Sequence, residues 1–188
     1  MKFSPAEKRD LLKAWFVVAL VFAISDTGLS LTALFFLKLV ITGFTAGLGF
    51  LIHEIAHKLV AVHFKCRAEF HSFDQMLLLS ILLSFLGFVF IAPGAVIIFG
   101  ARSKAHEGKI SAAGVVANLL LALLFLVLMF TPLQPIAHYG LAINTWLAVF
   151  NLIPLGNFDG LKIFNWSKKA YVALLLFAGI MTQLPLFI

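Results

Sequence analysis

Three ionisable side chains lie within five residues of one another in the segment His53-Glu54-Ile55-Ala56-His57. Residues i and i+4 share one face of a helix, so both imidazoles can bind a single zinc ion while Glu54 lies beside the water on that ion. Zinc lowers the pKa of such a water towards ~7, and the glutamate can take its proton as general base and later deliver it to a leaving amine. A pair of surface histidines beside a glutamate is the alternative, but three ionisable groups in an apolar helix are costly to bury without a function. The pattern favours metal-assisted hydrolysis of a peptide bond.

A catalytic zinc ion needs a third protein ligand and one open position. His63 occupies the last slot of the longer pattern H-E-x-x-H-x-x-G-x-x-H, but residue 60 of this chain is valine and not glycine. If the helix continues, His63 lies about 9 Å further along the axis and roughly 100° away from the face that carries the first two histidines. Glu69 and Asp74 are possible ligands from a loop, although acids on a surface loop are usually only solvated.

Asp159 is the third ligand that the sequence favours, because it follows a break in an apolar helix at Pro154. Irregular backbone at membrane depth is tolerated where it is buried in protein or lines a wet cavity. The histidine pair lies just before the basic cluster Lys58–Arg67, and Asp159 lies just before the basic cluster Lys162–Lys169. Both are therefore expected at the same depth, although an aspartate that only caps a helix is the alternative.

The composition places these residues in a membrane protein. Of the 188 residues, 62% are hydrophobic and 12% are charged, with a mean hydropathy of +1.07. Soluble domains are about 45–50% apolar and about 25% charged, so a chain this apolar cannot cover a water-facing surface. One integral-membrane domain over residues 1–188 is expected. Cys66 is the single cysteine, which excludes an intrachain disulfide.

The apolar runs predict an all-α polytopic membrane protein with about five spanning helices. The first begins at a capping box formed by Ser4 and Glu7, with Pro5 at its first helical position. The expected spans are Pro5–Ile24, Leu31–His63, Ile110–Phe130, Ile136–Ile153 and Ala170–Ile188. The run Leu77–Phe99 is expected to be a re-entrant hairpin whose return arm, Ala95–Phe99, is a short β element after Pro93-Gly94.

Basic residues set the expected orientation. With the N-terminus in the cytoplasm, all lysines and arginines except Lys38 fall on the cytoplasmic side, and the stem of Lys38 can snorkel to the headgroups. The formal net charge of +6 is then explained by topology, and nucleic acid is not needed as a partner. An integral protein of a prokaryotic plasma membrane, with its metal site near the cytoplasmic face, is expected.

The pairing of H-E-x-x-H with the later segment N-x-x-P-x-x-x-x-D-G resembles the site-2 proteases, the intramembrane zinc metalloproteases. Their histidines, glutamate and aspartate correspond to His53, Glu54, His57 and Asp159, and their asparagine corresponds to Asn151, eight residues before the aspartate. The helix Ser111–Asn118 is similar to their A-G-P-x-x-N helix, with Val115 in place of proline, and Leu161 replaces a common second glycine. The resemblance covers roughly residues 45 to 165 and implies a minimal core without PDZ or CBS domains.

The resemblance implies a zinc metalloendopeptidase that acts in regulated intramembrane proteolysis, with one Zn²⁺ per chain and a transmembrane protein or peptide as substrate. Asn151 would hold the substrate backbone or the developing oxyanion, since a carboxamide offers both donors and an acceptor. Asn118 would bind substrate in the same way or simply bond to another helix. We hypothesise that an edge of Ala95–Phe99, or of Cys66–Phe73, pairs with an unwound substrate by strand addition.

Two other functions account for part of the pattern. A membrane zinc transporter or metal sensor also places histidines and acids on helices, but transport predicts more than one polar site across the membrane. A binding module without catalytic activity would retain the fold, yet all three expected ligands and the general base are present.

Overall fold

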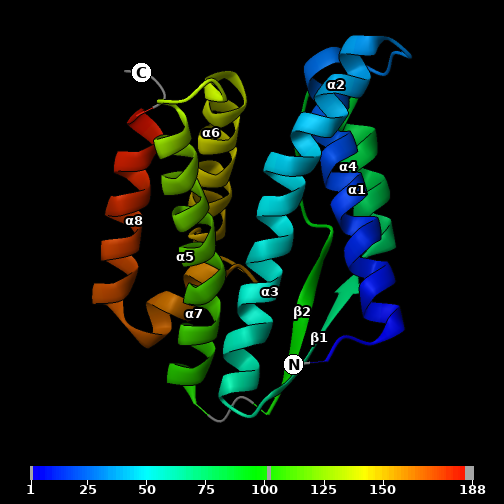
Figure 1. Ribbon diagram of the computed structural model, residues 1–188. Helices are drawn as coiled ribbons and strands as arrows, with labels where there is room; N and C mark the ends of the chain where they lie inside the picture. Colours follow the sequence, from blue (N-terminus) through cyan, green and yellow to red (C-terminus); the bar gives the residue numbers. More distant parts are fainter. Residues whose placement is uncertain (1, 101–102, 185–188) are drawn as a thin grey trace. The chain divides into compact units, whose positions relative to one another are not determined.

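A computed structural model describes residues 2–100 and 103–184 as eight α-helices, one π-helix and a two-stranded sheet (Figure 1). The elements are α1 (Pro5–Thr27), α2 (Ala33–Thr42), the π-helix η1 (Gly43–Gly47), α3 (Leu48–His63), β1 (Arg67–Ser72), α4 (Asp74–Ser84), β2 (Gly94–Phe99), α5 (Lys104–Leu128), α6 (Gln134–Asn151), α7 (Asp159–Trp166) and α8 (Lys168–Gln183). They form two compact units, Met1–Leu51 with Glu69–Ile97 and Ile52–Ala68 with Ile98–Ile188. The division falls inside α3 and inside both strands.

The prediction of about five spanning helices is wrong. Among the described residues, two helices are long and apolar enough to cross a membrane: Ala33–His63, which joins α2, η1 and α3, and Lys104–Leu128, which is α5. α1 has the length, but its charged residues are spread over both ends of the helix, as Glu7, Asp10 and Asp26 show. α6 is interrupted by polar side chains, and α8 has 16 residues. The last four residues of the expected span Ala170–Ile188 lie outside the described part of the chain.

The first unit is built on α1, which begins as its capping residues predict. Pro5 occupies the first turn, and the Ser4 hydroxyl accepts a hydrogen bond of 3.1 Å from the Glu7 N–H. α1 packs against α2, η1 and α4. The indole of Trp15 lies against Gly43 and Gly47 of the π-helix, and its Nε1–H donates to the Gly43 carbonyl at 2.9 Å. Small residues in η1 therefore allow α1 to approach the backbone closely.

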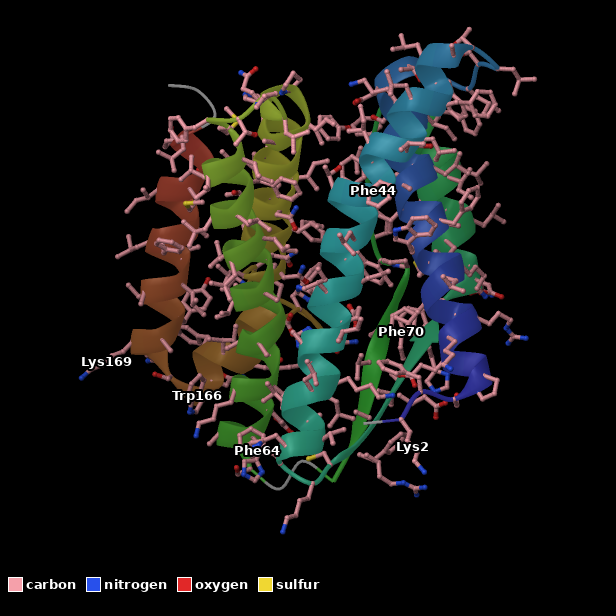
Figure 2. The ribbon with its side chains drawn as sticks, viewed as in Figure 1. Lys2, Phe44, Phe64, Phe70, Trp166 and Lys169 are labelled. Carbon is pink, nitrogen blue, oxygen red and sulfur yellow. The ribbon has the colours of Figure 1, made fainter. Side chains whose placement is uncertain are left out.

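The sheet pairs β1 with β2. The N–H of Phe73 donates to the Pro93 carbonyl, and Gly94 lies against His71 and Ser72, so the end of β1 meets the start of β2 and the strands are antiparallel. On β1, the N–H groups of Phe70 and Ser72 donate to the carboxylates of Glu7 and Asp10 on α1. Phe70 is buried, with its ring edge-on to Phe50 (Figure 2).

The second unit consists of α5 to α8 together with residues 52–63 of α3. α5 contacts α6, α7 and α8, and α6 and α7 also contact α8 (Figure 1). One apolar cluster contains residues from or directly beside all four of these helices: Val115, Leu119, Ala148, Leu152, Ile163, Tyr171 and Ala178. The short α7 reaches α5 where Trp166 packs on Gly108 (Figure 2 labels Trp166). This packing fixes α7, and hence its first residue Asp159, against α5.

Candidate metal centre

Three ligand-bearing side chains converge within the second unit. His53, His57 and Asp159 each offer a ligand atom, and these atoms all lie within 4.8 Å of one another. The Nε2 atoms of the two histidines are 2.9 Å apart. The Oδ2 atom of Asp159 lies 3.3 Å from Nε2 of His53 and 3.1 Å from Nε2 of His57. All three residues are less than one-tenth exposed, so a cation held between them would be largely removed from water.

The Nδ1 atom of each imidazole lies within hydrogen-bond distance of an oxygen on α5. The two histidines lie four residues apart on α3, with their rings edge-to-face at 4.5 Å. Nδ1 of His57 is 2.8 Å from the carbonyl oxygen of Ile110, and Nδ1 of His53 is 2.6 Å from Oδ1 of Asn118. A carbonyl oxygen only accepts, so Nδ1 of His57 must donate. Its Nε2 lone pair is then available to a metal, which is the usual arrangement of a ligating histidine.

Asp159 reaches the histidines because the chain turns back after α6. That helix ends at Asn151, Pro154 follows, and Asp159 is the first residue of α7. A Cβ on Gly160 would come within 2.2 Å of the carbonyl oxygen of Leu152, so only glycine permits this close return of the backbone. Burial alone would raise the pKa of the Asp159 carboxyl, but the two imidazoles beside it lower that pKa below its ordinary value. The carboxylate is therefore ionised, as a metal ligand must be.

The donor set matches a zinc ion. Two Nε2 atoms and one carboxylate oxygen lie around a common point, and a bound cation would neutralise such an electron-rich group. Ligand atoms around a tetrahedral zinc ion lie roughly 3.3 Å from one another, given metal–ligand distances of about 2.0–2.1 Å. The observed separations of 2.9, 3.1 and 3.3 Å are close to this value. Three protein ligands also leave the fourth position that a catalytic zinc ion needs.

One curated relative covers most of the chain. A protein of Methanocaldococcus jannaschii named "Putative zinc metalloprotease MJ0611" is 35% identical over an alignment of 173 residues that covers 88% of this chain and 87% of the relative. The chain belongs to the same zinc metalloprotease family. No family model and no solved structure matches it. Membership of a zinc metalloprotease family and a buried His-His-Asp cluster together fit zinc-dependent proteolysis.

The other candidate ligands from the sequence lie elsewhere. The ring of His63 packs edge-on against Phe64. The carboxylate of Glu69 accepts a hydrogen bond of 2.5 Å from Ser4, and the carboxylate of Asp74 bonds to Lys13 and Ser72. None of the three belongs to the metal-binding group found among the described residues.

The predicted general base and substrate-binding residues have different surroundings. Glu54 is 7% exposed and follows the first histidine on α3. Asn151 is half-buried at the end of α6, where one N–H of its carboxamide donates to the Leu147 carbonyl at 2.9 Å. Asn118 is fully buried on α5 and bonds to His53. Roles for these residues in substrate binding or proton transfer remain predictions.

Sequence reasoning missed two residues that shape this zinc metalloprotease site, Gly114 and Asn144. Gly114 lies against both imidazoles, and Asn144 bonds to Asn118. A signal for each was present. Gly114 and Asn118 are four residues apart and hence share a face of their helix, and Asn144 is a carboxamide in an otherwise largely apolar run.

Replacing Gly114 with alanine is expected to disrupt the metal site. A Cβ at this position would lie 2.5 Å from Cε1 and 2.6 Å from Nε2 of His57, and 2.7 Å from Cε1 of His53. Because the ligand rings would have to move, we expect zinc content at a fixed free-zinc concentration to fall about tenfold or more, as for loss of a supporting contact. Elemental analysis of the purified variant measures this. The control is Gly179→Ala on α8, where an added Cβ meets nothing within 4 Å, and equal zinc content in all three proteins would contradict the prediction.

Proposed function

We propose that this protein is an intramembrane zinc metalloprotease of the site-2 protease type, which hydrolyses peptide bonds of transmembrane substrates near the cytoplasmic side of the bilayer. The observation that carries the proposal is the buried cluster of His53, His57 and Asp159, with Glu54 adjacent on the same helix. Two of the three ligands lie on Ala33–His63, which is one of the two helices in the described part of the chain that are apolar and long enough to cross a membrane. A protease whose ligands lie on such a helix meets its substrate within or at the edge of the bilayer.

Exposed apolar side chains support placement in a membrane. In the first unit, α2 exposes Leu34, Phe36, Leu37 and Val40 along one short helix, and the side chain of Phe44 projects from η1 (Figure 2). In the second unit, Leu120, Phe130 and Trp146 are more than half exposed. Soluble monomers rarely expose apolar patches larger than a few hundred Å², because water penalises them. Lipid would be a favourable solvent for both units.

The chain's own residues would divide the chemistry among them. When bound, a zinc ion supplies a Lewis acid that polarises the scissile carbonyl and lowers the pKa of water. Glu54 takes the proton from the attacking water and passes it to the leaving amine. Asn151 retains a second N–H and a carbonyl oxygen on its carboxamide, and we assign these to the substrate backbone. His53, His57 and Asp159 hold the metal, one ion per chain.

The substrate must be unwound before it can be cut, because a helix hides its peptide bonds. Strand addition to the sheet would achieve this. Of the two edges that the sequence suggested, the one on β1 already donates its Phe70 and Ser72 N–H groups to α1. We therefore place the substrate against β2, Gly94–Phe99.

The orientation and location follow the basic residues. We assign the N-terminus to the cytoplasm and the protein to a prokaryotic plasma membrane, because lysines and arginines concentrate beside the metal-binding segments, as in Lys58–Arg67 and Lys162–Lys169. A zinc transporter is the second candidate, but transit requires several polar sites in succession. Among the described residues, the candidate metal ligands form a single group.

Metal removal tests the proposal directly. Cleavage of a transmembrane peptide by the purified protein in detergent is expected to stop in a chelator and to return with added zinc, because the metal held by the three ligands is what activates the attacking water. A water-soluble peptide of the same sequence around the scissile bond, without its apolar flanks, is the control substrate and should be cut poorly. Zinc-dependent cleavage of both peptides at equal rates would contradict the intramembrane assignment. Zinc flux into liposomes without any cleavage would instead establish a transporter.

A further inference from the structure

A chain of buried carboxamides runs from the backbone of α6 to the first histidine of the metal centre. Nδ2 of Asn144 donates to the Gly140 carbonyl at 2.9 Å. Nδ2 of Asn118 donates to Oδ1 of Asn144 at 3.2 Å, and Oδ1 of Asn118 lies 2.6 Å from Nδ1 of His53. All four residues belong to the second unit, and both asparagines have 0% of their surface exposed.

The Gly140 carbonyl, at the end of this series of hydrogen bonds, fixes which group donates in each of them. The Gly140 carbonyl only accepts, so the NH₂ group of Asn144 must face it and the oxygen of Asn144 must face Asn118. The NH₂ group of Asn118 must then face Asn144, and its oxygen must face the imidazole. An oxygen cannot donate here, so Nδ1 of His53 carries the proton. The remaining ring nitrogen, Nε2, presents its lone pair to Asp159 and to the other histidine.

The two histidines reach the same tautomer by different means. Nδ1 of His57 donates to a backbone carbonyl, that of Ile110, which is part of α5 and needs no further support. The partner of His53 is a side chain, which has two possible orientations and would be free to flip without a second group to hold it. Asn144 is that second group. Burying two asparagine side chains in an apolar interior is unfavourable unless their polar groups are hydrogen-bonded. A role in orienting the metal ligand His53 would explain why both are present.

We propose that Asn118 and Asn144 are positioning residues for the metal site: Asn144 orients Asn118, and Asn118 holds the imidazole of His53 with Nε2 towards the metal. This rests on the proposed function in that a metal is bound there, and it replaces substrate binding as the role of Asn118. The side-chain oxygen of Asn118 lies beside Nδ1 of His53, and one of its N–H groups donates to Asn144.

Zinc affinity measured by chelator competition tests the proposal without using activity. Asn118→Ala is expected to weaken zinc binding about 10- to 100-fold, the usual effect of losing the partner of a ligating histidine. Asn144→Ala should weaken it less, because the acceptor for Nδ1–H remains but its orientation is no longer fixed. Asn118→Asp restores an acceptor oxygen for Nδ1–H but loses the N–H group that donates to Asn144, so it should recover only part of the affinity. Unchanged affinity in both alanine variants would overturn the proposal.

A matched control separates positioning from a general effect on packing. Thr145 follows Asn144 on α6 and is also buried, and its hydroxyl has no hydrogen-bond partner among the described residues. Thr145→Val removes a buried polar group of the same helix and should leave zinc affinity unchanged. The absorption spectrum of the cobalt-substituted protein should change in Asn118→Ala and not in Thr145→Val, because only the former releases a ligand ring. A higher KM with an unchanged spectrum and unchanged metal affinity would instead assign Asn118 to substrate binding.

The same variants report on the imidazole when no metal is bound. With ¹⁵N-labelled histidine at alkaline pH, we expect the parent protein to show His53 as the Nδ1–H tautomer and Asn118→Ala to show a mixture. A mixture in the parent would refute the positioning role. If the parent instead has the expected tautomer but binds no zinc and cuts no peptide, the proposed function fails while the hydrogen-bond chain stands, so the two failures are distinguishable.

Discussion

Replacing Glu54 with glutamine is expected to lower the rate of peptide cleavage by about 10²- to 10⁴-fold while zinc stays bound. The substitution keeps the size and polarity of the side chain but removes the carboxylate that accepts a proton from water. Glu54 is not among the three residues whose ligand atoms converge, so the metal should not be lost. Single-turnover cleavage of a transmembrane peptide, with zinc content measured on the same sample, gives both quantities.

The control for this variant is Glu107→Gln, which removes an exposed carboxylate from the first turn of α5. It should cleave at the parental rate. Retained activity in Glu54→Gln would refute the general-base mechanism. Loss of both zinc and activity would show that Glu54 acts on the metal site itself.

The local part of the site could be predicted from the sequence because it depends on helix geometry alone. Residues four apart on any α-helix share a face, and α3 runs without interruption through His53 and His57. The break that positions Asp159 was also visible, since Pro154 cannot continue a helix. The pairing of Asp159 with the histidines was predicted from its depth in a topology of about five spans, and that topology is wrong. The three residues nevertheless converge, because α7 folds back onto α5.

The number of spans could not be predicted from apolar content, because apolar runs also build short helices that pack on one another. Ile136–Ile153 was predicted to span the membrane, yet its polar residues include Asn144, which accepts a hydrogen bond from Asn118 inside the second unit. The acids at the start of α1 also have partners that the sequence did not indicate, because Glu7 and Asp10 accept hydrogen bonds from the β1 backbone. Such long-range partners leave no periodic signal in a single sequence.

Replacing Asp159 with asparagine is expected to weaken zinc binding by about 10²- to 10³-fold. Structural zinc sites bind with about 10–16 kcal/mol in total, or roughly 2.5–4 kcal/mol for each of four ligands, and about 1.4 kcal/mol corresponds to a tenfold change. Asparagine has the shape of aspartate but no charge, so the substitution removes the negative charge that lies beside the two Nε2 atoms. Chelator competition on the purified protein measures the change, and cleavage should fall with zinc occupancy.

Two control variants make this result decisive, because they remove the ligands that the sequence left open. Asp74→Asn removes an exposed carboxylate that bonds to Lys13, and His63→Ala removes a ring that packs on Phe64. Both variants should bind zinc as the parent does, since neither residue belongs to the cluster of His53, His57 and Asp159. If Asp159→Asn kept its zinc while either control lost it, the third ligand would lie elsewhere and the His-His-Asp assignment would be wrong. If all three bound zinc equally, the two histidines alone would hold the metal, and Asp159 would be only the first residue of α7.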